Sequence, residues 1–216
     1  LGAGLVCLLG VIDDLWELDA LTKIIGQLLG ALIMSMLGLN WTLLYIPFGD
    51  GTTVLLDQFW SVVITVLFTV TLINAINFVD GLDGLAAGLG MIAGGSILLF
   101  SLTILHDQGG MVSAYPPAII AAGLVGVCAG FLPHNFEPSR IFMGDSGSLA
   151  LGGAMVAFAL FTRTELLLLV IALIPVLEVF SVIVQKFVFK TSRKRSVAAG
   201  EKPLHAHRYF RMTPFH

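Results

Sequence analysis

Long apolar runs interrupted by short acidic clusters constrain this chain more than any other feature. Of its 216 residues, 57% are hydrophobic and 12% are charged, and the mean hydropathy is +0.96. A helix needs about 20 apolar residues to cross a bilayer, and several runs approach or reach that length. Such a composition excludes an ordinary soluble domain. The sequence therefore predicts an all-α, polytopic membrane protein.

Seven membrane segments are predicted from the lengths of these runs. The segment at 147–162 is short and rich in glycine, which is typical of a helix packed closely against its neighbours. No soluble domain intervenes, so we expect a single transmembrane domain over residues 1–216. The chain opens at Leu1 inside an apolar run, and we expect a fragment that lacks its beginning. The predicted segments are 1–12, 24–42, 59–76, 84–105, 117–133, 147–162 and 166–189.

The distribution of positive charge assigns a side of the membrane to each loop. If the loop at 13–23 is cytoplasmic, ten of the 11 lysines and arginines lie in or at the edge of cytoplasmic loops, and only Arg163 lies outside. The same alternation brings acidic residues from three distant motifs to the cytoplasmic face. These residues are Asp13, Asp14, Asp80, Asp83 and Asp145.

Clustered carboxylates beside a membrane indicate a bound cation. Several carboxylates at one interface would repel one another and raise each other's pKa unless a cation neutralised them. Magnesium prefers one or two protein carboxylates together with substrate phosphates. The glycines of these loops, such as Gly81 and Gly144, allow backbone N–H groups to approach phosphate oxygens. The pattern favours phosphoryl transfer from a cytoplasmic donor to a membrane-embedded acceptor.

Three motifs resemble one enzyme family. They are Asn74–Leu85 (NAINFVDGLDGL), Gly130–Asn135 (GFLPHN) and Ile141–Ser148 (IFMGDSGS). They resemble the polyprenyl-phosphate N-acetylhexosamine-1-phosphate transferases of glycosyltransferase family 4. The resemblance implies an enzyme dependent on Mg2+, with Mn2+ as the alternative ion. Such an enzyme transfers a sugar-1-phosphate from a UDP-N-acetylhexosamine to undecaprenyl or decaprenyl phosphate and releases UMP.

The resemblance also implies a cellular setting. Members of the family are multi-pass proteins of the bacterial plasma membrane, with a cytoplasmic active site that starts the synthesis of cell-envelope polymers. The implied partners are the UDP-sugar, the polyprenyl phosphate and membrane lipids, without nucleic acid, and a homodimer stays open. Family members have further helices before the Asp13-Asp14 pair and a longer C-terminal end, so we expect both to be missing from this chain.

The motifs resemble two branches of the family, which use different sugar donors. Residues from about 10 to 150 resemble the GlcNAc-1-phosphate transferases of the WecA and TagO type. Residues from Leu149 onward resemble the phospho-MurNAc-pentapeptide transferases of the MraY type, which form lipid I in peptidoglycan synthesis. The longer match favours UDP-GlcNAc, with UDP-MurNAc-pentapeptide as the alternative.

Residue roles follow from the resemblance. Asp13 matches the aspartate proposed to deprotonate the lipid phosphate, with ordering of the site as the alternative role. Asp14 is its partner, with a solvated helix cap as the alternative, and Asp83 is a further site carboxylate. Asp145 matches a magnesium ligand, and Asn77 is a second ligand or a nucleotide contact.

The remaining candidates concern the nucleotide and the sugar. Asp80 matches a nucleotide-side residue. Phe142 matches the aromatic residue that stacks on uracil, with a buried core phenylalanine as the alternative. Asn135 is expected to order the site, with a turn-forming role as the alternative. Three histidines, imperfect matches to the histidine motifs of the family, are predicted to contact substrate; they are His205, His207 and His216.

Two rival functions belong to other classes. A transporter would carry its charged residues near the middle of the bilayer, whereas the acids here lie at the ends of the segments, with Glu178 as the exception. An inactive scaffold is the second rival. For an enzyme, we expect the polyprenyl tail to remain in the bilayer and to reach the site along a groove between helices, since each buried CH2 contributes about 0.8 kcal/mol.

Overall fold

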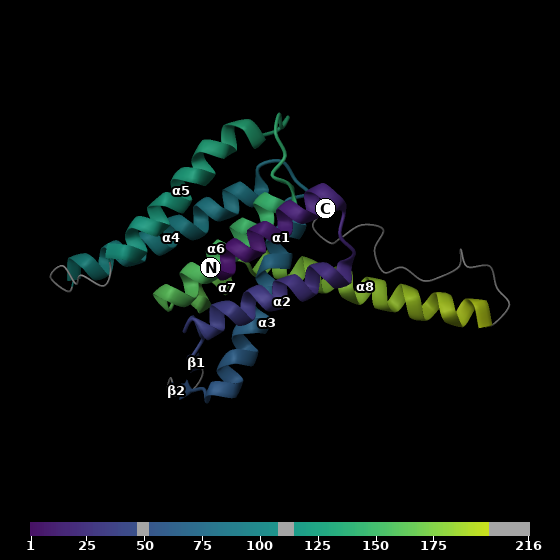
Figure 1. Cartoon of the computed structure of the whole chain (residues 1–216), viewed down its shortest axis with the longest axis horizontal. Helices are drawn as coiled ribbons and strands as arrows, with labels where there is room; N and C mark the ends of the chain where they lie inside the picture. Colours follow the sequence, from purple (N-terminus) through teal and green to yellow (C-terminus); the bar gives the residue numbers. More distant parts are fainter. Residues whose placement is uncertain (47–51, 108–114, 199–216) are drawn as a thin grey trace. The chain divides into compact units, whose positions relative to one another are not determined.

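The computed structural model describes residues 1–46, 52–107 and 115–198, and Figure 1 shows the chain. It comprises two compact units, Leu1–Ala172 and Leu173–His216. The second unit contributes one described helix, α8. The elements in chain order are α1 (Gly2–Trp16), α2 (Ala20–Met36), β1 (Leu43–Ile46), β2 (Thr52–Leu55), α3 (Gln58–Val79), α4 (Leu85–Asp107), α5 (Tyr115–Asn135), α6 (Gly144–Thr162), α7 (Glu165–Ile171) and α8 (Leu173–Ala198).

Helix α6 packs against more of its neighbours than any other described helix. It contacts α1, α3, α4, α5 and α7, while α4 and α5 lie side by side next to it (Figure 1). Small residues allow this approach: a Cβ added to Gly152 would lie 3.0 Å from the Cα of Ile73. Half of its apolar stretch is buried, against 22% for α5. The prediction of a closely packed helix at 147–162 is therefore confirmed.

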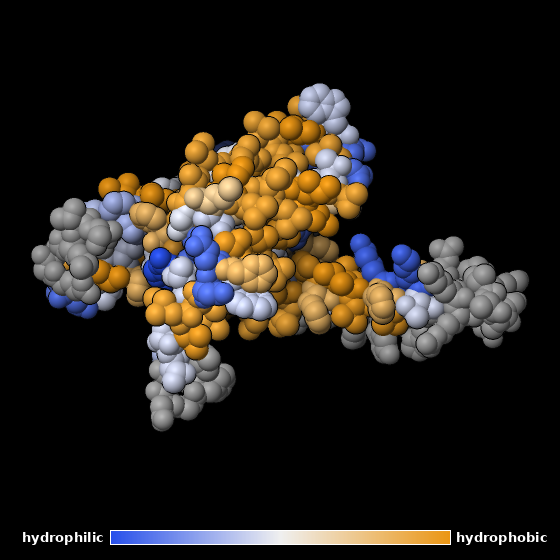
Figure 2. All heavy atoms as spheres, turned by 60° about the horizontal axis from the view of Figure 1, so that its bottom comes forward, coloured by the Kyte–Doolittle hydropathy of each residue, from blue (hydrophilic) through white to orange (hydrophobic). Residues whose placement is uncertain are grey.

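One apolar cluster of the core joins four helices of the first unit. Side chains from α1, α2, α3 and α6 meet there, and each of the four is at most 1% exposed: Val6, Met34, Ile73 and Leu149. The outer faces of the helices remain apolar as well, and Figure 2 shows hydrophobic side chains over most of the face drawn. Apolar residues on both the core and the outer face are what a bilayer-embedded bundle requires.

The all-α membrane fold is confirmed, but the count of seven spans is not. Within the described residues, four helices are long and apolar enough to cross a membrane, namely α3, α4, α5 and α6, and a fifth span results if α7 and α8 count as one. Helices α1 and α2 have 15 and 17 residues, which is short for a bilayer crossing. The segment predicted at 24–42 ends early, because the chain turns at Gly38 with a φ of 88°.

The segment predicted as one helix at 166–189 is two helices. Helix α7 ends at Ile171 and α8 begins at Leu173. Pro175 supplies the reason: its nitrogen has no hydrogen to donate to the carbonyl of Ile171, and its ring would clash with that carbonyl. The break could have been predicted from this proline.

A β-hairpin lies between the predicted segments 24–42 and 59–76. Strands β1 and β2 pair antiparallel, with Leu43 opposite Leu55 and Ile46 opposite Thr52. Trp41 anchors the hairpin to α3: its backbone N–H donates to Thr65 Oγ1 at 2.9 Å, and its ring packs edge-on against Phe68 at a centroid distance of 5.0 Å. Each strand has only four residues, which is too short for the alternation of apolar and polar residues to predict a strand.

Candidate active site

The ends of α1, α2 and α6 meet around the side chain of Lys23. Its Nζ donates to Asp145 Oδ2 at 2.7 Å and forms an ion pair with Asp13. Asp13 is only 4% exposed, and its Oδ1 also accepts the N–H of Leu18 at 2.7 Å. Helix α1 ends directly afterwards, because Glu17 adopts a left-handed backbone conformation with a φ of 47°. The turn that follows brings α2, and with it Lys23, back toward Asp13.

Helix α3 also contacts Asp145. Asn77, near the C-terminal end of α3, donates from Nδ2 to Asp145 Oδ1 and to Ser148 Oγ, both at 2.8 Å. Both oxygens of Asp145 are thus engaged, one by an ammonium and one by an amide. Among the hydrogen bonds of the described residues, none uses Oδ1 of Asn77. That oxygen can therefore serve as a ligand for a metal ion.

Asp14 caps the N-terminus of α6. Its Oδ1 accepts the N–H of Asp145 and its Oδ2 accepts the N–H of Ser146, both at 2.9 Å. Burial alone would raise the pKa of Asp14, but these hydrogen bonds outweigh burial and lower the pKa below its usual value. A carboxylate at this position also interacts favourably with the helix dipole. The capping role considered for this residue exists, but the helix it caps is α6 rather than its own.

Two glycines allow α1 and α6 to approach this closely. A Cβ on Gly10 would lie 2.4 Å from the carbonyl oxygen of Asp145. Gly144 has a φ of 68°, and a Cβ there would lie 3.1 Å from Asp14 Oδ2. The contact between the Asp13-Asp14 pair and the start of α6 therefore depends on both glycines.

Asn135 and Asp83 order the loop that precedes α6. Asn135 is buried; its Oδ1 accepts the N–H of Gly84 and its Nδ2 donates to the carbonyl of Ile141, both at 3.0 Å. Asp83 Oδ2 accepts the N–H of Ser139, also at 3.0 Å. The loop is therefore joined at two points to the turn between α3 and α4. Such bonds match the ordering role expected of Asn135.

Asp80 and Phe142 border the same region. Asp80 is the residue that ends α3, and its burial, with smaller effects from the charges of Asp145 and Asp14, raises its pKa to about 6. Phe142 is 75% exposed, so a core role for this side chain is excluded. Its ring is accessible for stacking. The candidate residues of four helices and of the turn between α3 and α4 thus lie at one end of the first unit, which we call the acidic end: Asp13, Asp14, Asn77, Asp80, Asp83, Asn135 and Asp145.

The side chains at the acidic end form no ready-made metal cage. Within residues 1–46, 52–107 and 115–198, no three His, Cys, Asp or Glu side chains are grouped closely enough to hold a metal ion. The donor set still suits magnesium, which needs only one or two carboxylates when phosphates and water complete its shell. In this structure Lys23 supplies the neutralising charge between Asp13 and Asp145. The predicted substrate contacts His205, His207 and His216 lie outside the described residues.

Lys23 is the site residue that sequence reasoning missed. From the sequence alone, Lys23 is only one of the positive charges that mark the cytoplasmic side of the membrane. Its position ten residues after Asp13 was visible, but which carboxylates it reaches depends on the turn at Glu17 and on the packing of α6. Ser148, which accepts from Asn77, was missed for the same reason.

An apolar groove between α5 and α6 begins beside the acidic end. It has a volume of about 530 Å3. Met143 and Gly147, on either side of Asp145 in sequence, line it at the start of α6. Farther along, Ala154 and Phe158 of α6 face Leu124 of α5 across it. The groove therefore extends along the helices from the region of Asp145.

Comparison with known proteins identifies the family of the chain. The family profile described as Glycosyl transferase family 4 matches residues 1–163, well over half of the sequence. The chain belongs to this family. It is 44% identical, over 94% of its length, to the decaprenyl-phosphate N-acetylglucosaminephosphotransferase of Mycolicibacterium smegmatis, of which it covers 53%. The protein of the same name from Mycobacterium leprae is 53% identical over 69% of the chain and 37% of the relative.

A second group of relatives carries another name. The chain is 42% identical, over 96% of its length, to the phospho-N-acetylmuramoyl-pentapeptide-transferase of Desulfitobacterium hafniense, of which it covers 64%. The chain thus spans about half the length of its mycobacterial relatives and less than two thirds of this one. The two branches that the motifs resemble are the two groups found.

Proposed function

We propose that this chain forms the core of a membrane enzyme that transfers a sugar-1-phosphate from a UDP-sugar to a polyprenyl phosphate. The observation that carries the proposal is the meeting of Asp13, Lys23, Asn77 and Asp145 at one end of the helical bundle, in a member of glycosyl transferase family 4. The enzyme would lie in the bacterial plasma membrane, with the acidic end toward the cytoplasm. Most of the positive charge lies on that side in the predicted topology.

The reaction exchanges one phosphorus–oxygen bond for another. An oxygen of the acceptor phosphate attacks the phosphorus that carries the sugar, a new phosphorus–oxygen bond forms, and the bond to the departing UMP breaks. Catalysis of this kind rests mainly on positioning and charge neutralisation. The residues of the acidic end would supply both.

Asp145 and Asn77 would hold a divalent cation, with Mg2+ favoured and Mn2+ as the alternative. When bound, the ion would neutralise charge on the phosphates of the donor. Lys23 places a positive charge between Asp13 and Asp145. Without the donor it contacts these carboxylates, and with the donor bound it would contact the phosphates. This lysine makes the site fit an anionic substrate even though it carries several acids.

The two adjacent aspartates would have different roles. Asp13 is buried and is held by Lys23, which also contacts Asp145. It would take the proton of the acceptor phosphate or order the site. Both carboxylate oxygens of Asp14 accept hydrogen bonds from N–H groups of α6. It would act by positioning Asp145. Asp80 and Phe142 would contact the uridine part of the donor, and the loop ordered by Asn135 and Asp83 would place Phe142.

The acceptor would enter from the lipid. We place its polyprenyl chain in the apolar groove between α5 and α6, because this groove begins at Met143 and Gly147, close in sequence to Asp145. A chain in the groove would keep its hydrocarbon out of water while its phosphate reaches the acidic end.

The favoured donor is UDP-GlcNAc. The identity to the Mycobacterium leprae relative rises to 53% over 149 residues, whereas the Desulfitobacterium relative reaches 42% over 224. UDP-MurNAc-pentapeptide is the alternative, supported by the similarity of the C-terminal part.

Release of UMP tests the proposal. The purified chain is incubated with decaprenyl phosphate, Mg2+ and either UDP-GlcNAc or UDP-MurNAc-pentapeptide. We expect UMP and a lipid-linked sugar phosphate from UDP-GlcNAc, and no product without the acceptor. Asp145→Asn should abolish the product, because an amide supplies an oxygen but no charge. Turnover of the muramoyl donor alone would overturn the preferred donor, and transport of a solute without UMP release would overturn the enzyme.

A further inference from the structure

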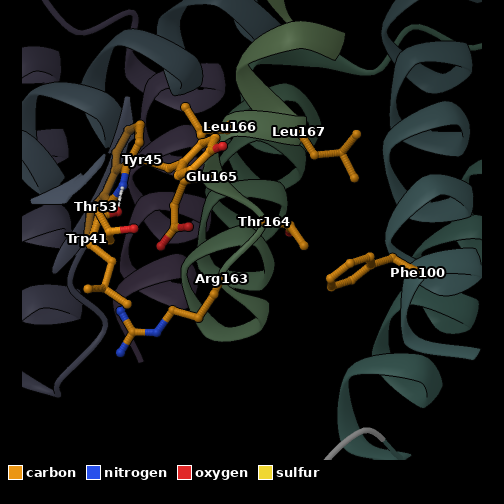
Figure 3. A pocket seen from close by; sticks show the side chains of 10 residues that line it. Trp41, Tyr45, Thr53, Phe100, Arg163, Thr164, Glu165, Leu166 and Leu167 are labelled. Atoms are coloured by element: carbon orange, nitrogen blue, oxygen red, sulfur yellow. Dashed lines mark hydrogen bonds between the residues drawn. The ribbon is translucent and has the colours of Figure 1, made fainter. Parts of the chain in front are cut away.

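A pocket that contains two charged side chains lies at the other end of the same helices (Figure 3). Its volume is about 470 Å3, and its lining includes Trp41, Tyr45, Phe100, Arg163, Glu165 and Leu167. From Asp145 in the first turn of α6 to Arg163 at its C-cap, a rise of about 1.5 Å per residue makes about 27 Å. This separation is close to the thickness of the hydrocarbon core of a bilayer. The pocket therefore lies at the depth of the headgroups of the opposite leaflet.

Glu165 is a buried carboxylate that faces this pocket. The residue is 5% exposed, and its Oε1 is buried without a hydrogen-bond partner. In the described part of the chain, no lysine, arginine or histidine forms an ion pair with it. A carboxylate removed from water needs a compensating cation or donor. The guanidinium of Arg163 acts on this carboxylate from beyond ion-pair distance, but no described residue donates a hydrogen bond to its Oε1.

Arg163 lies beside Glu165 with part of its guanidinium engaged. Its Nη1 donates to the carbonyl of Asn40 at 2.7 Å and to Thr42 Oγ1 at 2.9 Å. These bonds hold the guanidinium at the pocket wall. Among the described residues they leave Nε and Nη2 for an anionic ligand, and guanidinium groups suit phosphate oxygens. In Figure 3, the side chains of Arg163 and Glu165 extend toward the same side of the pocket.

The rest of the lining is aromatic or apolar. Trp41 and Tyr45 lie on the side toward which the two charged side chains extend, while Phe100 and Leu167 lie on the other side (Figure 3). An ammonium group is attracted to aromatic faces as well as to a carboxylate. The pocket thus offers a site for a cation, a site for a phosphate and an apolar wall, all within one headgroup-sized volume.

We propose that this pocket binds a phospholipid whose headgroup carries a primary ammonium. The ammonium contacts Glu165, the phosphate contacts Arg163, and the first part of an acyl chain lies beside Phe100 and Leu167. This binding site is separate from the acidic end, and the inference does not depend on the proposed transferase reaction.

Lipid retention measured by native mass spectrometry tests the inference. The chain is purified in detergent, stripped of lipid and incubated with an equimolar mixture of dioleoyl phosphatidylethanolamine, phosphatidylglycerol and phosphatidylcholine. We expect preferential retention of phosphatidylethanolamine. Glu165→Gln should reduce that retention about tenfold, the loss of one charge-assisted contact. The matched control is Asp107→Asn, which removes a carboxylate that is 69% exposed at the same end of α4 and should change nothing.

A second variant guards against misfolding of the first. Leu167→Trp fills the pocket from its apolar side without touching either charge, and it should also lose the retained lipid. Equal retention of the three lipids, or equal retention by Glu165→Gln and Asp107→Asn, would overturn the inference. If soluble phosphoethanolamine displaces the lipid at a similar concentration, the ligand is a free amine that carries a phosphate. That result would overturn the lipid assignment.

Discussion

At the scale of single residues, the ammonium group of Lys23 lies between two carboxylates, one of which is almost fully buried. Breaking an ion pair by removing one partner leaves the other charge uncompensated, which costs more than the pair itself contributes. A divalent cation between the same carboxylates would compensate the same charge. The two cations are therefore alternatives for one region of negative potential.

Lys23→Met should lower the stability of the chain by about 1–3 kcal/mol in the presence of a chelator, because Asp13 loses its counter-charge. Adding Mg2+ should raise the melting temperature of the variant more than that of the parent. Thermal unfolding in detergent measures both. Lys186→Met, at an exposed position of α8, is the control and should respond like the parent. An equal effect of Mg2+ on all three proteins would contradict the role of Lys23.

The raised pKa of Asp80, about 6, predicts a pH dependence with a definite sign. An acid whose pKa is higher in the folded state stabilises the folded protein at low pH. This stabilisation is lost as the pH rises from the ordinary pKa of an aspartate, 3.8, through about 6. With a chelator present, the melting temperature of the parent should therefore fall relative to that of Asp80→Asn between about pH 4 and pH 6. Melting curves at a series of pH values test this. Parallel profiles of the two proteins would exclude the raised pKa.

At the scale of elements, the approach of α1 to α6 decides whether the acidic end forms. Gly10→Ala places a methyl group 2.4 Å from the carbonyl oxygen of Asp145, so one helix must move. We expect a loss of about 1–3 kcal/mol in stability, as for other overpacked sites, together with loss of UMP release. Gly4→Ala on the same helix is the matched control, since no atom lies within 4 Å of the added carbon. It should be neutral or stabilising, by up to about 1 kcal/mol.

The groove between α5 and α6 can be filled without touching a polar residue. Ala154→Trp should block the acceptor chain, raising the KM for decaprenyl phosphate while leaving the KM for the UDP-sugar unchanged. Leu99→Trp, at a position of α4 that is exposed and outside the groove, should change neither value. Steady-state kinetics against each substrate distinguish the outcomes. A normal KM for the acceptor in Ala154→Trp would place the polyprenyl chain elsewhere.

At the scale of the whole molecule, positive charge predicts that the acidic end faces the cytoplasm. In a background without Cys7 and Cys128, a cysteine replacing exposed His106 should react with a membrane-impermeant maleimide added to intact cells. A cysteine replacing exposed Glu137, beside the acidic end, should react only after the membrane is opened. The opposite pattern of labelling would reverse the orientation.

The sequence by itself determined the membrane class, the approximate position of the long helices and the gathering of acids at one end. The physical reason is that hydrocarbon accepts few charges, so aspartates are confined to the ends of apolar runs, and alternation of the runs assigns each end to a side. Asp13, Asp80 and Asp145 could therefore be grouped from sequence. Their assignment to particular chemical roles came from resemblance alone and stays a prediction.

Only the tertiary structure decided how these residues are used. Lys23 reaches Asp145 across 122 positions of sequence, and Asp14 caps a helix that begins 130 residues later. No periodicity records such partners, because they depend on how closely two helix backbones approach, and that depends on glycines such as Gly10 at the point of contact. The pocket around Glu165 is another feature that the sequence does not reveal. These contacts and this pocket form where segments far apart in sequence pack together, after the apolar pattern has placed them in the membrane.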